Sequence, residues 1–179
     1  MIRLSRKTLL ALEAVIDIAY NARPEPVQAK EITARQMWTA CEAQLPADIA
    51  ICSAAVADWR PETAANSKLK KRDAPSTIKL AENPDILAGL ARHSSRPSLV
   101  IGFAAETDDL IANASAKRVA KGCDWIVAND VSRGIMGGDK NLVHIITANG
   151  EEAWPEMSKI DVAKRLAARI ADAVEKRAA

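Results

Sequence analysis

Cysteine and histidine are scarce in this chain, and their placement excludes several kinds of site. The 179 residues include three cysteines, Cys41, Cys52 and Cys123, with no CxxC pair and no zinc-ligand spacing. An odd number of unpaired cysteines is typical of a reducing compartment, and we expect all three to be small buried apolar residues. His93 and His144 lie far apart in the sequence. We assign neither of them a metal-binding or catalytic role, and the metal ligands stay unassigned.

Glycine is also rare, with seven residues in all and none before Gly89. The glycine-rich phosphate-binding motifs GxxxxGK[ST] and GxGxxG are both absent. No Ser/His/Asp or Cys/His arrangement indicates a catalytic nucleophile either. Any nucleotide that this chain binds must therefore be held without these fingerprints.

Neither the charge nor the apolar runs indicate a nucleic acid or a membrane as a partner. Lys and Arg number 25 and Asp and Glu 23, for a formal net charge of +2, so a general nucleic-acid-binding surface is not indicated. The apolar run within Met1–Tyr20 is broken by Glu13 and Asp17, and no stretch approaches the ~18 apolar residues of a membrane span. We therefore expect a cytoplasmic protein with no membrane partner and no nucleic-acid partner.

Three short apolar runs, bounded by Pro, Gly or Asp, predict strands of a parallel sheet that is buried on both faces. They are Asp48–Val56, Ser98–Ala105 and Cys123–Ala128. Asp108–Lys121, between the last two, is predicted to be a helix that ends at Gly122. This strand–helix–strand order is the repeating unit of a doubly wound α/β fold.

Two hairpins are predicted to interrupt this pattern. Lys68–Leu80 places Asp-Ala-Pro between two Lys-rich segments with strand-like alternation. Val143–Trp154 contains Asn149-Gly150, the strongest two-residue turn signal.

Helices are predicted at both ends of the chain. Residues 7–20 and 29–41 have helical patterns near the start. A final helix is expected after an N-cap at Ser158, with the apolar stripe Val162, Leu166, Ile170 and Val174.

Polar residues follow the predicted strands, at the edge where open α/β sheets bind ligands. Asp58 follows the first strand, Glu106 the second, and Asn129 and Asp130 the third. Taken singly, each is an ordinary cap or turn residue. Taken together, three such ends in adjacent strands favour a binding site.

Lysines are the candidate cations for an anionic ligand. Lys68, Lys70 and Lys71 lie on the first predicted hairpin, which could close over a polyphosphate, although a Lys-rich edge hairpin is more often simply solvated. Lys117 and Lys121 are four residues apart and share one face of a helix. They lie near its C-terminal end, where cations are favourable in any case, so the residues alone leave both interpretations open.

Five segments, in order, carry a resemblance to a known family. They are AAVADWRP at Ala54–Pro61, KLKK at Lys68–Lys71, TIKLAENPDIL at Thr77–Leu87, VIGFAAET at Val100–Thr107 and IVANDV at Ile126–Val131. From about Met37 to Val174 the chain resembles the phosphopantothenoylcysteine synthetase domain of bacterial bifunctional coenzyme A biosynthesis proteins. That family consists of CTP-dependent phosphopantothenate–cysteine ligases.

The resemblance implies a two-step ligation in coenzyme A biosynthesis. The carboxylate of 4'-phosphopantothenate attacks the α-phosphate of CTP to give an acyl-cytidylate and pyrophosphate, and the amine of cysteine then displaces CMP. Mg²⁺ bridges the phosphates in such chemistry, and the family is dimeric, so Mg²⁺ and a homodimer are expected. The matching positions imply a catalytic flap lysine at Lys68. They imply nucleotide contacts at Cys52, Ser53, Ala54, Asp58, Lys68, Pro84, Asp85, Ile86, Leu87, Phe103, Lys117 and Lys121.

Residues 1–36 do not fit this family. They resemble the N-terminus of a winged-helix regulator of the iron–sulfur-cluster or iron-responsive type, although the recognition helix, the wing and the cluster cysteines are absent. The glycine-rich turn and the serine–glycine segment that bind phosphopantothenate in the ligase family are missing too. We expect a helical segment at 1–36 joined to a ligase-like nucleotide-binding domain at 37–179. The junction between these two parts arose either from a chimeric reading frame, which we favour, or from a natural rearrangement.

The predicted fold is α/β: a truncated Rossmann-like parallel sheet with flanking helices, a Lys-rich hairpin flap, a C-terminal β-hairpin and an N-terminal helical attachment. The predicted function is the CTP-dependent ligation, with weak or absent activity because the acid-substrate region is missing. The alternatives are a chimeric fragment of a winged-helix transcription regulator and an inactive nucleotide-binding remnant.

Overall fold

The computed structural model describes residues 34–63, 77–131 and 140–178. Lys68, Lys70 and Lys71 lie outside these residues, as does the helix predicted over residues 7–20. In chain order the described elements are α2 (Ala34–Glu42), β1 (Ile49–Cys52), β2 (Trp59–Pro61), β3 (Leu80–Glu82), α3 (Ile86–Arg92), β4 (Leu99–Glu106), α4 (Leu110–Lys121), β5 (Trp125–Asp130), β6 (Lys140–Asn141), β7 (Val143–Thr147), β8 (Gly150–Ala153), β9 (Met157–Ser158) and α5 (Lys159–Ala178).

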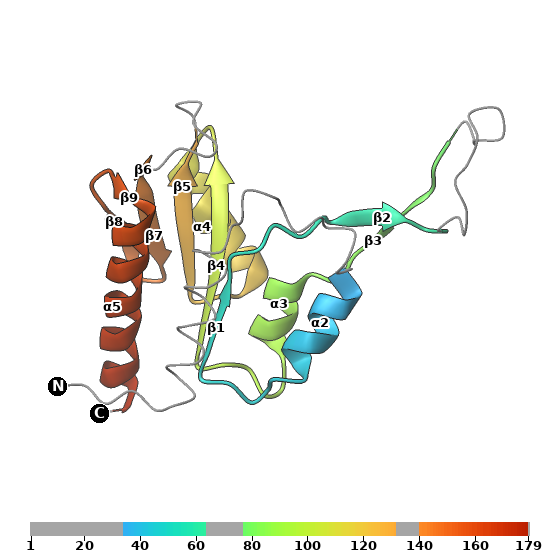
Figure 1. The fold of residues 1–179 in the computed structure, drawn as a ribbon, viewed down its shortest axis with the longest axis horizontal. Coiled ribbons are helices and arrows are strands. Elements are labelled where there is room, and N and C mark those ends of the chain that lie inside the picture. Colours follow the sequence, from blue (N-terminus) through green and yellow to red (C-terminus); the bar gives the residue numbers. More distant parts are fainter. Residues whose placement is uncertain (1–33, 64–76, 132–139, 179) are drawn as a thin grey trace.

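A five-stranded sheet forms the centre of the structure, with the strand order β1-β4-β5-β7-β8. Strands β1, β4 and β5 are parallel, whereas β7 and β8 extend the sheet in antiparallel fashion from β5. This parallel core with flanking helices confirms the predicted α/β fold class (Figure 1). None of the helices in the described part of the chain has the length and hydrophobicity of a membrane span.

Helices cover both faces of the sheet. Helix α5 lies along one face, and α3 and α4 lie on the other, with α2 packed against α3 (Figure 1). Alternate residues of a strand point to opposite faces. Leu99 and Ile101 of β4 therefore enter the core beneath α5, whereas Val100 and Ala104 enter the core beneath α4. Because both faces are buried, this strand is a continuous apolar run in the sequence.

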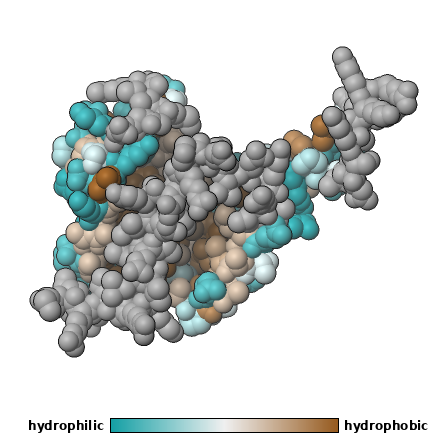
Figure 2. Space-filling view, viewed as in Figure 1, coloured by the Kyte–Doolittle hydropathy of each residue, from teal (hydrophilic) through white to brown (hydrophobic). Residues whose placement is uncertain are grey.

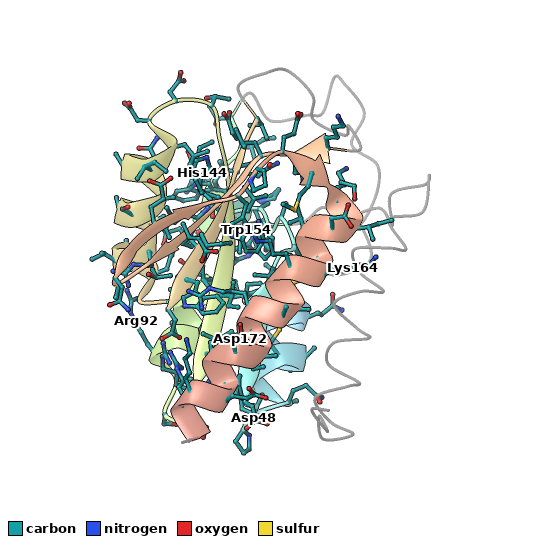
Figure 3. The ribbon with its side chains drawn as sticks, turned by 90° about the vertical axis from the view of Figure 1, so that its left-hand side faces the viewer. Asp48, Arg92, His144, Trp154, Lys164 and Asp172 are labelled. Carbon is teal, nitrogen blue, oxygen red and sulfur yellow. The ribbon has the colours of Figure 1, made fainter. Side chains whose placement is uncertain are left out.

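The final helix begins and packs as its sequence predicts. Ser158 Oγ accepts a hydrogen bond from the Asp161 N–H at 3.1 Å and donates one to the Asp161 carboxylate at 2.7 Å, which caps the helix. Of the predicted apolar stripe, Val162, Leu166 and Ile170 are buried against the sheet and Val174 is partly buried. Trp154 lies where α5 meets the sheet (Figure 3), and the guanidinium of Arg165 stacks 4.7 Å from the centre of its ring.

Helix α4 and the β7–β8 hairpin form where predicted, with one shift. Gly122 ends α4 in the left-handed conformation, with φ at 72°. In the hairpin, Thr147 pairs with Gly150. The two turn residues are therefore Ala148 and Asn149, not Asn149 and Gly150, and the positive φ of 122° falls on Gly150.

Two strands of the parallel core have different bounds from those predicted. Strand β1 ends at Cys52, which pairs with Gly102 of β4, because the following residues leave the sheet and line a cavity. Strand β5 begins at Trp125 and continues to Asp130, which pairs with Glu106. The polar residues Glu106, Asn129 and Asp130 therefore lie within β4 and β5, whereas Asp58 lies in the loop after β1.

Only the base of the predicted Lys-rich hairpin, where β2 pairs with β3, lies within the described residues. Strands β2 and β3 are antiparallel, and Leu80 pairs with Pro61. The paired region therefore starts earlier in the chain than the predicted span Lys68–Leu80. Residues 64–76, between the two strands, lie outside the described ranges.

Candidate functional site

A cavity of about 590 Å³ lies at the carboxyl end of β1, where Phe103 of the neighbouring strand β4 also lines it. Its wall comes from the loop after β1, the start of β2, the loop from β3 into α3, and one side of α2 and of α4. The carboxyl edge of a parallel sheet is where open α/β folds bind ligands. This cavity is therefore the candidate functional site.

The cavity brings together eleven of the twelve residues that the resemblance predicts as nucleotide contacts. They are Cys52, Ser53, Ala54, Asp58, Pro84, Asp85, Ile86, Leu87, Phe103, Lys117 and Lys121. The twelfth, Lys68, lies outside the described residues. Asn129 and Asp130 lie on β5 and do not line the cavity. The ligand contacts of all twelve residues stay predictions.

Two glycines allow the cavity wall to form. A Cβ atom on Gly102 of β4 would lie 2.5 Å from Leu87 Cδ2 of α3, and one on Gly89 of α3 would lie 2.5 Å from the ring of Trp38 of α2. Neither approach is open to a residue with a side chain unless the neighbour moves. Glycine at these two positions thus lets α3 pack closely on the sheet and α2 pack closely on α3.

Asp85 connects two parts of the wall. It is the N-cap of α3, and one of its carboxylate oxygens accepts a hydrogen bond from the Ala88 N–H at 3.0 Å. The other oxygen accepts one from Lys121 Nζ of α4 at 2.5 Å. Burial acts to raise the pKa of Asp85, but the hydrogen bonds from Lys121 and Ala88 and the nearby positive charge outweigh it. The pKa therefore lies below its ordinary value, and Asp85 is ionised at neutral pH.

The charges on the described part of the wall nearly cancel. Three carboxylates, those of Asp58, Glu82 and Asp85, line the cavity together with the ammonium groups of Lys117 and Lys121. Lys121 and Asp85 form an ion pair and neutralise each other. A polyanionic ligand in this cavity therefore needs further positive charge, either from a bound cation or from residues outside the described ranges.

Two of the three cysteines also line the cavity. Cys41 and Cys52 are half-buried and only Cys123 is fully buried, so the prediction of three buried cysteines is wrong for two of them because the cavity opens beside β1. Burial is the main factor that raises the pKa of Cys52 to about 12, and the neighbouring Cys41, Cys123 and Asp85 raise it further. The Cys52 thiol is therefore protonated at neutral pH and is a poor nucleophile.

The described residues contain no group of three His, Cys, Asp or Glu side chains that could hold a metal ion. Mg²⁺ that arrives with a substrate needs less, because it keeps several waters and binds through phosphates and only one or two carboxylates. Asp58 in the cavity wall fits this requirement. Asp85 fits it less well, because its charge is already paired with Lys121 and its carboxylate caps α3.

Sequence reasoning missed several residues of the wall. Met37 and Cys41 come from α2, and no local signal in the sequence connects this helix with the site. Trp59, Glu82 and Asn83 also line the cavity. They lie inside the segments Ala54–Pro61 and Thr77–Leu87 that carry the family resemblance, within two residues of predicted contacts, but no contact is predicted for them.

Comparison with protein families gives a match over most of the chain. Residues 14–174 match the family described as the DNA/pantothenate metabolism flavoprotein C-terminal domain. This match begins upstream of Met37 and gives no support to the resemblance between residues 1–36 and a winged-helix regulator. The division between residues 1–36 and 37–179 stays a prediction.

Similar proteins share a name drawn from coenzyme A biosynthesis. The Coenzyme A biosynthesis bifunctional protein CoaBC of Escherichia coli strain K12 is 39% identical over 141 residues, covering 74% of this chain and 35% of that protein. The protein of the same name from Bacillus subtilis strain 168 is 42% identical over 127 residues, covering 69% of this chain and 31% of that protein. The chain thus spans about a third of the length of these relatives.

Solved structures have the same fold. A crystal structure of the C-terminal domain of the Coenzyme A biosynthesis bifunctional protein CoaBC has a TM-score of 0.62 at 28% identity, covering 80% of this chain and 65% of that chain. The crystal structure of the DNA/Pantothenate Metabolism Flavoprotein from Streptococcus pneumoniae has a TM-score of 0.62 at 17% identity, covering 78% of this chain and 70% of that chain. At that identity the second likeness concerns the fold alone.

Proposed function

Because this chain belongs to the DNA/pantothenate metabolism flavoprotein C-terminal domain family, we propose that it acts in the CTP-dependent joining of 4'-phosphopantothenate to cysteine in coenzyme A biosynthesis. The relatives that it matches are coenzyme A biosynthesis proteins by name. In the proposed reaction the acid attacks the α-phosphate of CTP and pyrophosphate leaves. The amine of cysteine then attacks the acyl carbon of the acyl-cytidylate, loses a proton and displaces CMP.

One observation carries this proposal. Eleven predicted contact residues, from segments spread between residues 52 and 121, share one cavity at the carboxyl edge of the parallel sheet. The apolar side chains of Ile86, Leu87 and Phe103 suit a nucleoside. The ammonium groups of Lys117 and Lys121 suit its phosphates.

The charge of the triphosphate requires more than these two lysines, because Lys121 is already paired with Asp85. We assign the remaining positive charge to Lys68, the proposed catalytic lysine, and to Mg²⁺ that arrives with CTP. Lys68 lies in the chain between β2 and β3, and residues of both strands line the cavity. Asp58 is the residue that would hold the magnesium ion, which would supply electrostatic stabilisation of the phosphates.

This chemistry requires no nucleophile from the protein. The substrate carboxylate and the cysteine amine are the nucleophiles, so the protein holds the reacting groups in line and neutralises charge. The Cys52 thiol, with its pKa of about 12, is suited to contact and not to attack. The three cysteines are free thiols, which supports the cytoplasm as the proposed compartment.

We also propose a homodimer that forms through the β2–β3 ribbon. The ribbon extends away from the sheet (Figure 1) and carries hydrophobic surface (Figure 2). Its exposed side chains include Trp59, Ile78 and Leu80, which are 53%, 67% and 57% exposed. Pro61 and Leu80 are cross-strand partners and share a face with Trp59. Exposed apolar side chains that gather on a projecting ribbon favour burial against a second copy of the chain.

The test combines turnover with binding. The purified chain is incubated with MgCl₂, CTP, 4'-phosphopantothenate and cysteine, and pyrophosphate and the amide product are measured. Pyrophosphate release should require the acid, and amide formation should also require cysteine. CTP should raise the Tm of the chain more than ATP does.

Two substitutions locate the activity. Lys121→Met should weaken CTP binding by about tenfold or more, because it removes a charged hydrogen-bond donor from the cavity. Lys164→Met is the matched control, since Lys164 lies on the exposed side of α5 (Figure 3). CTP binding without pyrophosphate release would identify a nucleotide-binding remnant instead. Absence of CTP binding would refute the proposal.

A further inference from the structure

Asn83 makes contacts that its position in the sequence does not reveal. It lies between β3 and α3, directly before Pro84, and its half-buried side chain lines the cavity. In this segment the family resemblance predicts nucleotide contacts for residues 84–87 and none for Asn83.

Asn83 holds two consecutive carbonyl groups of the loop that follows β1. Its backbone N–H donates to the Asp58 carbonyl at 2.8 Å. Its side-chain Nδ2 donates to the Ala57 carbonyl, also at 2.8 Å. This loop lies between β1 and β2, outside the strands of the sheet, so these hydrogen bonds attach it to the segment that leads into α3.

Arg60 fixes the amide group of Asn83 from the other side. Its Nη1 donates to Asn83 Oδ1 at 3.2 Å and also to the Glu82 carbonyl. With Oδ1 accepting from Arg60, the Nδ2 group of Asn83 is the part that points to Ala57. The orientation of the amide is thus set by partners on both of its sides.

We infer that Asn83 is a positioning residue for the bound nucleotide, an inference that rests on the proposed function. It fixes the loop that carries Asp58 relative to the N-terminus of α3. Both of these parts line the cavity, but the two hydrophobic clusters of the described residues contain neither Asn83 nor residues 57–60. Polar contacts, namely the side-chain hydrogen bonds of Asn83 and the adjacent backbone pairing of Trp59 with Glu82, therefore set the distance between these two parts of the wall.

The decisive variant is Asn83→Leu, which removes both polar atoms of the side chain with little change in size and none in charge. Asn113→Leu is the matched control. Asn113 Nδ2 donates to the Asp108 carbonyl at 2.9 Å, an exposed hydrogen bond of the same kind, and Asn113 does not line the cavity. The Kd of Mg²⁺–CTP is measured by calorimetry and the Tm by thermal denaturation for the wild type and both variants.

Asn83→Leu is expected to raise the Kd for CTP about tenfold, equal to ~1.4 kcal/mol. The Tm should shift by no more than it does in Asn113→Leu, whose Kd should equal that of the wild type. If Asn83 had only a structural role, Asn83→Leu would lower the Tm more than Asn113→Leu does and would leave the Kd of the folded protein unchanged. An unchanged Kd in Asn83→Leu would overturn the positioning role.

A second variant decides the matter if Asn83→Leu does not fold. Arg60→Lys keeps the positive charge but shortens the group that fixes the Asn83 amide. It should raise the Kd for CTP about threefold, and an unchanged Kd would overturn the inference. A wild-type chain that binds no CTP overturns the proposed function itself. That failure is recognised separately because it is measured on the unaltered chain.

Discussion

Replacing Asp85 separates the two contacts that its carboxylate makes, one within α3 and one between helices. Asp85→Asn keeps a side-chain oxygen that can cap α3, because Asn and Asp are equally good N-caps. It removes the negative charge that pairs with Lys121. Asp85→Ala removes the cap and the charge together. The two variants therefore measure the contacts one at a time.

The expected magnitudes follow from the exposure of the groups. Loss of an N-cap lowers the free energy of unfolding by ~1 kcal/mol. The side chains of Lys121 and Asp85 are 31% and 42% exposed, so solvent screening limits their ion pair to ~0.2–1 kcal/mol. We expect a loss of ~0.5 kcal/mol for Asp85→Asn and ~1.5 kcal/mol for Asp85→Ala. Their difference corresponds to ~2–4 °C in Tm for a chain of this size.

Urea and thermal denaturation of the wild type and both variants test these values. Adding Lys121→Met and the double variant Asp85→Asn with Lys121→Met completes a double-mutant cycle, whose coupling energy should be ~0.2–1 kcal/mol. Equal losses in Asp85→Asn and Asp85→Ala would refute the assigned role of the cap. A coupling energy of zero would show that the ion pair adds nothing to stability.

Further predictions concern the core, acid conditions and assembly. Gly102→Ala should lower the free energy of unfolding by ~1–3 kcal/mol, because the new Cβ would lie 2.5 Å from Leu87 Cδ2; an unchanged Tm would contradict this packing. The pKa of Asp85 lies below its ordinary value of 3.8, so its stabilising effect is complete above that pH and is lost as the pH falls below it. The Tm difference between the wild type and Asp85→Asn should therefore shrink in acid, and a difference that grows would contradict the assignment. Ile78→Asp with Leu80→Asp should convert the proposed dimer to a monomer in light scattering, whereas a wild-type monomer would refute the dimer.

Elements whose boundary signals lie within their own few residues could be predicted from the sequence. The second predicted strand, at residues 98–105, is β4 at Leu99–Glu106. Helix α4 ends at the predicted Gly122 and α5 follows the predicted cap at Ser158. Proline, glycine and capping residues act on the backbone next to them, so their effect is independent of the rest of the fold.

Contacts between distant segments could not be predicted in this way. Asp85 and Lys121 are 36 residues apart, and neither local pattern contains a signal that pairs them. The short strands β6 and β9 pair with each other although neither has a strand pattern of its own. The contribution of α2 to the cavity depends on Gly89, which lets Trp38 approach α3. Most residues of the candidate site are predicted only by the family resemblance, because spacing and composition do not specify them.

The separation between core and cavity has a consequence for every variant of this site. The sheet and its helices are held by buried apolar clusters, whereas the Asp85–Lys121 pair and the hydrogen bonds of Asn83 join exposed or half-buried parts of the wall. Each polar contact contributes ~1 kcal/mol or less to a total stability of ~5–15 kcal/mol, so the chain stays folded without it. The affinity of a ligand that contacts both parts of the wall is more sensitive, because a loss of only ~1.4 kcal/mol raises its Kd tenfold. Substitutions at Asp85 and Asn83 should therefore weaken nucleotide binding clearly but lower the Tm only slightly. Gly102→Ala should weaken binding and lower the Tm, because it moves the core and the wall together.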